Sequence, residues 1–227
     1  MVMVLAILAL VAVLWAAGAA VLSSLRRISF HQAFFLLPLK LLYRIDDRSL
    51  PRQPSEPPIL YAVLHQSRLD PALMLSLLPE DTLHILDERS ARSPWLEPWR
   101  EMARTIAFNP RHVFVSRRLV RHLRGRGRLA VYFPAGTVPD TRPYRLYRAV
   151  AKIAAAAEAR IVAVSVQGAK ATMFSLVPDA RRSPLAKLKV QALEPLAIAE
   201  LVARSPREPA TMAGALFDRV AEADAAP

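Results

Sequence analysis

The chain has 227 residues, of which 31 are Lys or Arg and 19 are Asp or Glu, giving a formal net charge of +12. This length accommodates one domain with an appendage and excludes two or three independent domains. An apolar fraction of 53% excludes a disordered chain, and the absence of cysteine excludes disulfide scaffolds, thiolate zinc sites, iron–sulfur clusters and cysteine nucleophiles. The basic charge leaves two acidic partners, a nucleic acid or an anionic membrane surface.

The first segment favours the membrane. Residues 1–25 carry no ionisable side chain, and the apolar run 2–22 is long enough to cross roughly 30 Å of hydrocarbon as a helix. No positive charge precedes this run, unlike in a secretory signal peptide, and Arg26 and Arg27 follow it at once. A core helix of a soluble domain is the alternative, but the run has no polar face. We therefore expect a retained membrane anchor.

A second apolar stretch, residues 33–43, is too short to span and is interrupted by Pro38 and Lys40. It predicts an interfacial or re-entrant helix, so that one span and a helical hairpin both remain open. Cations close to the anchor place the globular part on the cytoplasmic side of the cell inner membrane by the positive-inside rule. These cations are Arg26, Arg27, Lys40, Arg44 and Arg48.

A proline-rich segment, RQPSEPP at residues 52–58, cannot continue a helix and marks a boundary. We divide the chain into a membrane anchor at residues 1–48, a linker at 49–58 and a globular domain at 59–227.

In the globular part, short apolar runs alternate with helical patterns. The expected strands are residues 59–64, 82–86, 112–116, 128–133 and 160–166, with a late one at 187–193. The expected helices are residues 70–78, 93–104, 146–159 and 208–223, and a basic helix ends at Gly125 and Gly127. Continuous apolar strands that alternate with helices predict an α/β fold with a mostly parallel sheet covered on both faces.

Polar residues at strand ends are the candidates for chemistry. His65 follows the first strand directly, and Asp70 comes five residues later across a predicted turn. Such a carboxylate can hold one imidazole nitrogen and leave the other to take a proton from a substrate hydroxyl, as a general base. The alternative is that Asp70, followed by Pro71, is the N-cap of its helix and that His65 is an ordinary loop histidine. One carboxylate can do both.

Two other strand ends carry weaker patterns. Pro134 and Gly136 force a turn after residues 128–133, and the backbone N–H groups of such a turn can point at an anionic oxygen. A purely structural turn is the alternative. Arg117 and Arg118 follow the predicted strand 112–116, where a guanidinium can hold a phosphate. A solvated basic edge is the alternative there.

Together these patterns resemble the motifs of the glycerolipid acyltransferases, the lysophosphatidic acid acyltransferase superfamily. HQSRLDP is similar to the first motif, NHxSxxD, with His65, Ser67 and Asp70 in the matching positions. VFVSRR resembles the second motif with Arg117, FPAGT resembles the third motif, FPEGT, and IVAVSV resembles the fourth. The downstream VQGAKATMFS looks like the acyltransferase portion of bacterial acyl-carrier-protein synthetase/lysophosphatidylethanolamine acyltransferases.

The resemblance implies a membrane-bound enzyme that moves an acyl group from acyl-CoA or acyl carrier protein to the free hydroxyl of a lysophospholipid. The acceptor would be of the lysophosphatidic acid or lysophosphatidylethanolamine type. His65 would be the general base, Asp70 would orient it, and Arg117 would bind the acceptor's phosphate. The other substrate-binding residues that it implies are Ser67, Arg68, Phe133, Pro134, Ala135, Gly136 and Thr137.

The third motif departs from the family pattern, because Ala135 stands where glutamate is usual and Val138 where an arginine often follows. Three explanations are open: a diverged acceptor, a variant altered to weaken turnover, or a catalytically impaired homologue that binds lipid.

We expect neither a metal nor a cofactor beyond the acyl donor, since no metal-ligand spacing occurs. Nucleic-acid binding through the arginine-rich residues 117–128 is the weaker reading, because this tract has few aromatic residues. A basic amphipathic helix against phospholipid headgroups explains it better.

Overall fold

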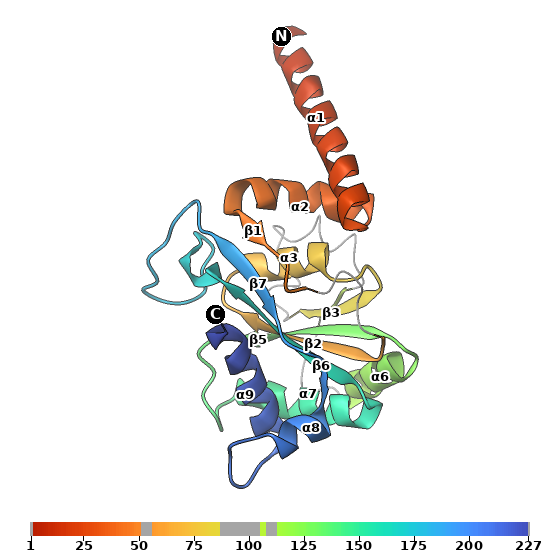
Figure 1. Ribbon diagram of the computed structural model, residues 1–227, viewed down its shortest axis with the longest axis vertical. Coiled ribbons are helices and arrows are strands. Elements are labelled where there is room, and N and C mark those ends of the chain that lie inside the picture. The colour runs from red at the N-terminus through yellow and green to blue at the C-terminus, as the bar shows by residue number, and fades with distance from the viewer. Residues whose placement is uncertain (1, 51–55, 87–104, 108–112, 227) are drawn as a thin grey trace.

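The computed structural model describes residues 2–50, 56–86, 105–107 and 113–226. Its first helix, α1 (Val2–Arg26), projects from the rest of the molecule (Figure 1). At 1.5 Å per residue α1 is roughly 37 Å long, which exceeds the hydrocarbon thickness of a bilayer. Its apolar side chains are almost all exposed, and it is the one helix within the described ranges that has the length and composition of a membrane span.

The second helix, α2 (Phe30–Tyr43), folds back against α1. Ser29 and Gln32 form a capping box at its start, which satisfies N–H groups that the helix itself cannot pair. Trp15 of α1 donates to the carbonyl oxygen of Phe34 at 2.9 Å and stacks on its ring. The predicted short apolar helix is thus present. With 14 residues it is about 21 Å long, too short to span a bilayer.

The globular part is an α/β fold, as predicted. Its sheet has the strand order β1-β7-β6-β2-β5-β3-β4, with β8 pairing β6. All neighbouring pairs are parallel except those that β7 and β8 make with β6. The strands are β1 (Ile45–Asp46), β2 (Ile59–His65), β3 (Thr82–Leu86), β4 (Thr105–Ala107), β5 (Arg128–Pro134), β6 (Arg160–Gln167), β7 (Leu188–Ala192) and β8 (Leu196–Ala197).

Helices cover both faces of this sheet (Figure 1). On one face α2 and α3 (Leu69–Leu77) pack on strand side chains such as Val63 and Val164. The opposite face packs side chains such as Leu60 and Leu129 against four described helices from the later part of the chain. These are α6 (Val113–Arg124), α7 (Tyr144–Ala157), α8 (Ile198–Ala203) and α9 (Met212–Ala225). The short 3₁₀ helix η2 (Ala169–Ala171) follows β6.

The connections make β2 and β5 the centre of the fold. The chain leaves β2 through α3 and reaches β3 on one side, whereas it leaves β5 through α7 and reaches β6 on the other side. In open α/β sheets, ligands bind at the carboxyl ends of strands where the connections diverge in this way. In the β2–β5 pair, His65 is opposite Pro134 at that edge.

One predicted strand is wrong. Val113 to Ser116, expected as the end of the strand 112–116, belong to α6, while residue 112 lies outside the described residues. The run Val-Phe-Val favours a strand locally, but Leu119 and Leu123 further along α6 are buried in the core. Helix formation is cooperative, so packing of this face favours helix in the residues before it as well. Arg117 therefore lies within a helix and not at a strand end.

The predicted helix 93–104 and residues 51–55 of the predicted linker also lie outside the described residues. The remaining expected elements are present, with ends displaced by up to four residues.

Candidate active site

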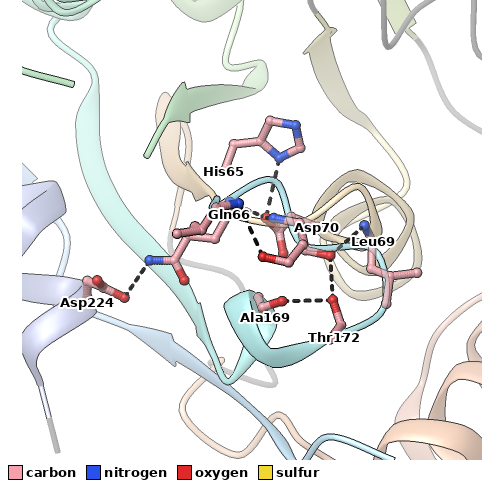
Figure 2. A network of polar contacts seen from close by, with 10 residues as sticks. His65, Gln66, Leu69, Asp70, Ala169, Thr172 and Asp224 are labelled. Atoms are coloured by element: carbon pink, nitrogen blue, oxygen red, sulfur yellow. Dashed lines mark hydrogen bonds and ion pairs between the residues drawn. The ribbon is translucent and has the colours of Figure 1, made fainter. Parts of the chain in front are cut away.

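His65 and Asp70 come together at the turn between β2 and α3. Asp70 is completely buried, and its Oδ2 lies 3.3 Å from His65 Nδ1 (Figure 2). The same oxygen accepts the backbone N–H groups of Gln66 and Ser67, each at 2.7 Å. The turn thus supplies donors that hold the carboxylate in place, and the carboxylate in turn holds the imidazole.

This arrangement corrects the predicted N-cap. The helix begins at Leu69, one residue before Asp70, and its N-cap residue Arg68 makes no side-chain capping bond. Asp70 instead accepts N–H groups that precede the helix. The carboxylate organises the strand-to-helix turn, in addition to contacting His65.

The contact sets the orientation of the imidazole. A carboxylate oxygen can only accept hydrogen bonds, so Nδ1 of His65 is the nitrogen that carries the hydrogen. Nε2 of the neutral ring then has a free lone pair. The side chain is 12% exposed, which leaves it accessible at the carboxyl edge of β2. This is the geometry that a general base requires.

A buried tyrosine–histidine pair lies behind His65, and sequence reasoning missed it. The Tyr132 ring meets the His65 ring edge-on at 5.9 Å between centroids, and its hydroxyl shares a 2.9 Å hydrogen bond with Nδ1 of His84. Burial lowers the pKa of His84 from 6.5 to about 3, so this histidine is neutral. Burial and then the charge of Asp70 raise the pKa of Tyr132 well above its usual value of 10.

The FPAGT turn lies beside His65, as the register of β2 and β5 requires. The backbone N–H of Ala135 donates to the carbonyl oxygen of His65 at 3.1 Å. Gly136 has a φ of 69°, a left-handed conformation that glycine adopts without strain. The Thr137 hydroxyl donates to the carbonyl oxygen of Pro134 at 2.7 Å. The turn is therefore rigidly built next to the proposed base.

The side chains of this motif point to different places. Phe133 is fully buried and packs on the Tyr147 ring at 4.2 Å, so it supports the turn from the α7 face. Ala135 is partly buried against the same apolar cluster. Pro134 and Gly136 are exposed at the edge, where a substrate can reach the backbone.

Ser67 and Arg68 have opposite environments. Ser67 is fully buried; its hydroxyl lies 2.9 Å from the Thr172 hydroxyl and accepts the N–H of Leu69 at 3.2 Å. It fastens the histidine turn to η2. Arg68 is exposed, and its backbone N–H donates to the carbonyl oxygen of Phe174 at 3.0 Å.

Gln66 connects the site to the last helix, which sequence reasoning also missed. Its side-chain Nε2 donates to Oδ1 of Asp224 in α9 at 3.0 Å (Figure 2), and its carbonyl oxygen accepts the N–H of Leu176 at 2.8 Å. Three parts of the chain that are distant in sequence therefore meet at the turn that carries His65.

Arg117 is the candidate that the structure does not bring into this group. It is exposed on α6 and lines a groove between α6 and α7, whereas the His65 ring lies against Tyr132 on the α3 face of the sheet. Within the described ranges, no three His, Asp or Glu side chains gather closely enough to hold a metal ion.

A sequence model of the Acyltransferase family matches residues 44–167, more than half of the chain. The chain belongs to this family. The predicted membership of the glycerolipid acyltransferase superfamily is thereby confirmed, whereas the relation to acyl-carrier-protein synthetase/lysophosphatidylethanolamine acyltransferases stays a prediction. The fold is similar to that of the crystal structure of the 1-acyl-sn-glycerophosphate (LPA) acyltransferase PlsC from Thermotoga maritima, with a TM-score of 0.54 and 15% sequence identity. The alignment covers 90% of this chain and 79% of that one.

Proposed function

We propose that this acyltransferase moves a fatty acyl group from a thioester to the free hydroxyl of a lysophospholipid at a membrane surface, with His65 as the general base. The observation that carries the proposal is the contact between His65 Nδ1 and the buried Asp70 carboxylate at 3.3 Å, with the imidazole accessible at the carboxyl edge of the sheet. Family membership supplies the reaction class.

The reaction needs two proton transfers, one from the acceptor hydroxyl to His65 and one from His65 to the departing thiolate. His65 Nε2 takes the proton of the acceptor hydroxyl as its oxygen attacks the thioester carbonyl carbon. A C–O bond forms, the C–S bond breaks, and the proton passes from His65 to the departing thiolate. Asp70 stabilises the imidazolium that forms in between and keeps the ring oriented. No covalent acyl-enzyme is required.

The turn formed by Pro134, Ala135, Gly136 and Thr137 would line the acceptor site. Its backbone is hydrogen-bonded to the residue that carries the base, so backbone N–H groups exposed there can polarise the thioester carbonyl as negative charge develops on its oxygen. Arg68 is exposed three residues after His65 and can meet the acceptor's phosphate. Ser67 would act through the turn it fastens. Arg117 lies on the α6 face of the sheet and is better placed to bind an anion other than the acceptor's phosphate.

Membrane attachment would keep the site near its amphiphilic substrates. In this proposal α1 spans the cell inner membrane and the domain at 59–227 faces the cytoplasm, as the cations after α1 predict. Asp47 is buried at the foot of α1, where it pairs with Arg26 at 2.7 Å and Lys40 at 3.1 Å. These ion pairs join α1 and α2 to the residue that follows β1, and β1 pairs with β7, so they fix the two N-terminal helices to the sheet of the globular part.

A catalytically impaired lipid-binding homologue is the second candidate, and Ala135 favours it. The family pattern has a carboxylate at this position, and Ala135 cannot place an acceptor by charge. The intact His65–Asp70 contact favours catalysis, because lipid binding alone needs no oriented imidazole.

Thiol release distinguishes the two candidates. The full chain in detergent is given acyl-CoA or acyl carrier protein with a panel of lysophospholipids, alongside Ala135→Glu and an exposed-histidine control, His31→Ala. Acceptor-dependent thiol release identifies a lysophospholipid acyltransferase and its headgroup, and a large gain in Ala135→Glu shows that the alanine limits turnover. Lysophospholipid binding without release from either donor contradicts the proposal and favours the lipid-binding homologue.

A further inference from the structure

A basic groove of about 700 Å³ lies between α6 and α7. It is on the face of the sheet opposite α2 and α3 (Figure 1). Its walls are cationic and its floor is apolar. The cations are Arg117, Arg121, Arg124, Arg145, Arg148 and Lys152, and the floor is Val120, Ala149 and Ile153.

Most of these charges are unpaired in the described part of the chain. Arg148 bonds Asp140 beside the groove, and Arg124 donates twice to the carbonyl oxygen of Ala156 at the end of α7, at 3.0 and 2.8 Å. Among the described residues, no acidic side chain lines the groove. Spacings of three and four residues bring like charges together on both helices, which destabilises a helix. An anion in the groove would relieve this repulsion.

The groove leads to the edge that carries His65. Because α7 follows β5 and returns along the sheet, it begins near the FPAGT turn, at the carboxyl edge. Arg145 is in its first turn and Lys152 is two turns further from that edge. A ligand with its charged end along the groove can therefore extend its other end over this edge toward the site.

We propose that this groove binds the phosphate groups of coenzyme A when acyl-CoA is the donor. The inference rests on the proposed function, since it assigns a site to that donor. Guanidinium groups match phosphates with paired N–H donors, the apolar floor suits the adenine ring, and the volume falls in the range of small-molecule sites, about 300–1,000 Å³.

Two other anionic partners fit less well. The membrane anchor α1 and α2 lie on the opposite side of the sheet (Figure 1), so a lipid headgroup would have to approach the groove from the side away from the anchor. An acidic carrier protein would need a broad interface of about 800 Å² on each partner, whereas the groove is a concave strip between two helices.

Isothermal titration of the full chain in detergent with CoA tests the site without any acceptor or turnover. The double variant Arg121→Ala/Lys152→Ala removes two exposed groove cations, and Arg118→Ala/Arg142→Ala removes two exposed cations outside the groove as the matched control. We expect the dissociation constant for CoA to rise by about tenfold or more in the groove variant and to stay within about twofold in the control. Pantetheine, which has no phosphate, should bind equally weakly to wild type and groove variant.

The assignment of the groove to CoA is refuted by an unchanged CoA dissociation constant in the groove variant. It is also refuted if titration of the groove variant shows weaker binding only of carrier protein or only of phosphatidylglycerol vesicles. The proposed function is tested separately with a defined acceptor. Transfer from acyl-CoA with an unchanged donor KM in the groove variant refutes the groove alone, whereas groove-dependent CoA binding without transfer supports the groove and refutes the proposed function.

Discussion

The buried pair His84–Tyr132 makes the stability of this protein depend on pH in a way that one substitution should remove. His84 is 1% exposed on β3, and burial lowers its pKa to about 3, against 6.5 for an unburied histidine. Between these two pKa values the unfolded chain therefore binds a proton at His84, whereas the folded chain does not. The stabilisation is present above pH 6.5 and is lost progressively as the pH falls toward 3.

The size of the effect follows from the two pKa values. Between pH 7 and pH 5 the unfolded state becomes almost fully protonated at His84 while the folded state stays neutral, which costs about 2 kcal/mol of unfolding free energy. For a domain of this size, about 2 kcal/mol corresponds to roughly 4–8 °C in the melting temperature.

The effect is measured as the change in melting temperature between pH 7 and pH 5, for the full chain in detergent, in wild type and in His84→Leu. Other titrating groups contribute equally to both proteins, so the difference between the two pH shifts isolates His84. At pH 7, His84→Leu also leaves the Tyr132 hydroxyl without its partner, which costs about 1–3 kcal/mol. Adding Tyr132→Phe should recover part of that cost.

Tyr132→Phe alone is the control, because it keeps the ring against His65 and leaves His84 able to titrate. It should retain the wild-type sensitivity to acid. If His84→Leu loses as much stability between pH 7 and pH 5 as wild type does, then His84 is not a buried neutral group and the reasoning fails.

Two further substitutions test the histidine turn. Asp70→Asn can keep an oxygen at the position that Gln66, Ser67 and His65 share, but it removes the negative charge that stabilises the imidazolium, so kcat should fall by about a hundredfold or more; steady-state kinetics with unaltered kcat would exclude a role for the Asp70 carboxylate. Ser67→Ala removes the contact with Thr172 and should lower the unfolding free energy by about 1–3 kcal/mol, seen as a lower melting temperature, and an unchanged melting temperature would show that the hydroxyl does not fasten the turn.

The sequence predicted the central strands well because each is a continuous apolar run. Residues 59–64 and 160–166 were expected as strands and form β2 and β6 with small changes at the ends. Such runs are buried on both faces of a parallel sheet, so composition alone marks them. The N-terminal helix was equally evident from its length and hydropathy, and it is present as a candidate membrane span.

Two sequence-based predictions were wrong, one because tertiary packing outweighs local propensity and one because a local turn competes with the helix. Val113 to Ser116 have strong strand propensity and yet are helical, because the buried face further along α6 favours a helix. Asp70 was expected to cap the helix that follows it, but it accepts N–H groups from the turn before. A spacing in sequence cannot tell these two directions apart.

The site could be predicted in part. His65 and Asp70 are close in sequence, and their contact follows from one turn. His84 and Tyr132 are 48 residues apart, and their meeting depends on β3 lying next to β5. That neighbourhood is set by the sheet order, which no local pattern encodes.

The most direct test of the account is the acyl transfer rate of His65→Ala with the best acceptor of the panel, measured against wild type and His31→Ala. The account predicts that kcat falls by about 10²–10⁴ in His65→Ala, with folding and acceptor binding retained, and that His31→Ala is unchanged. Transfer by His65→Ala at the wild-type rate would contradict the assignment of His65 as the general base.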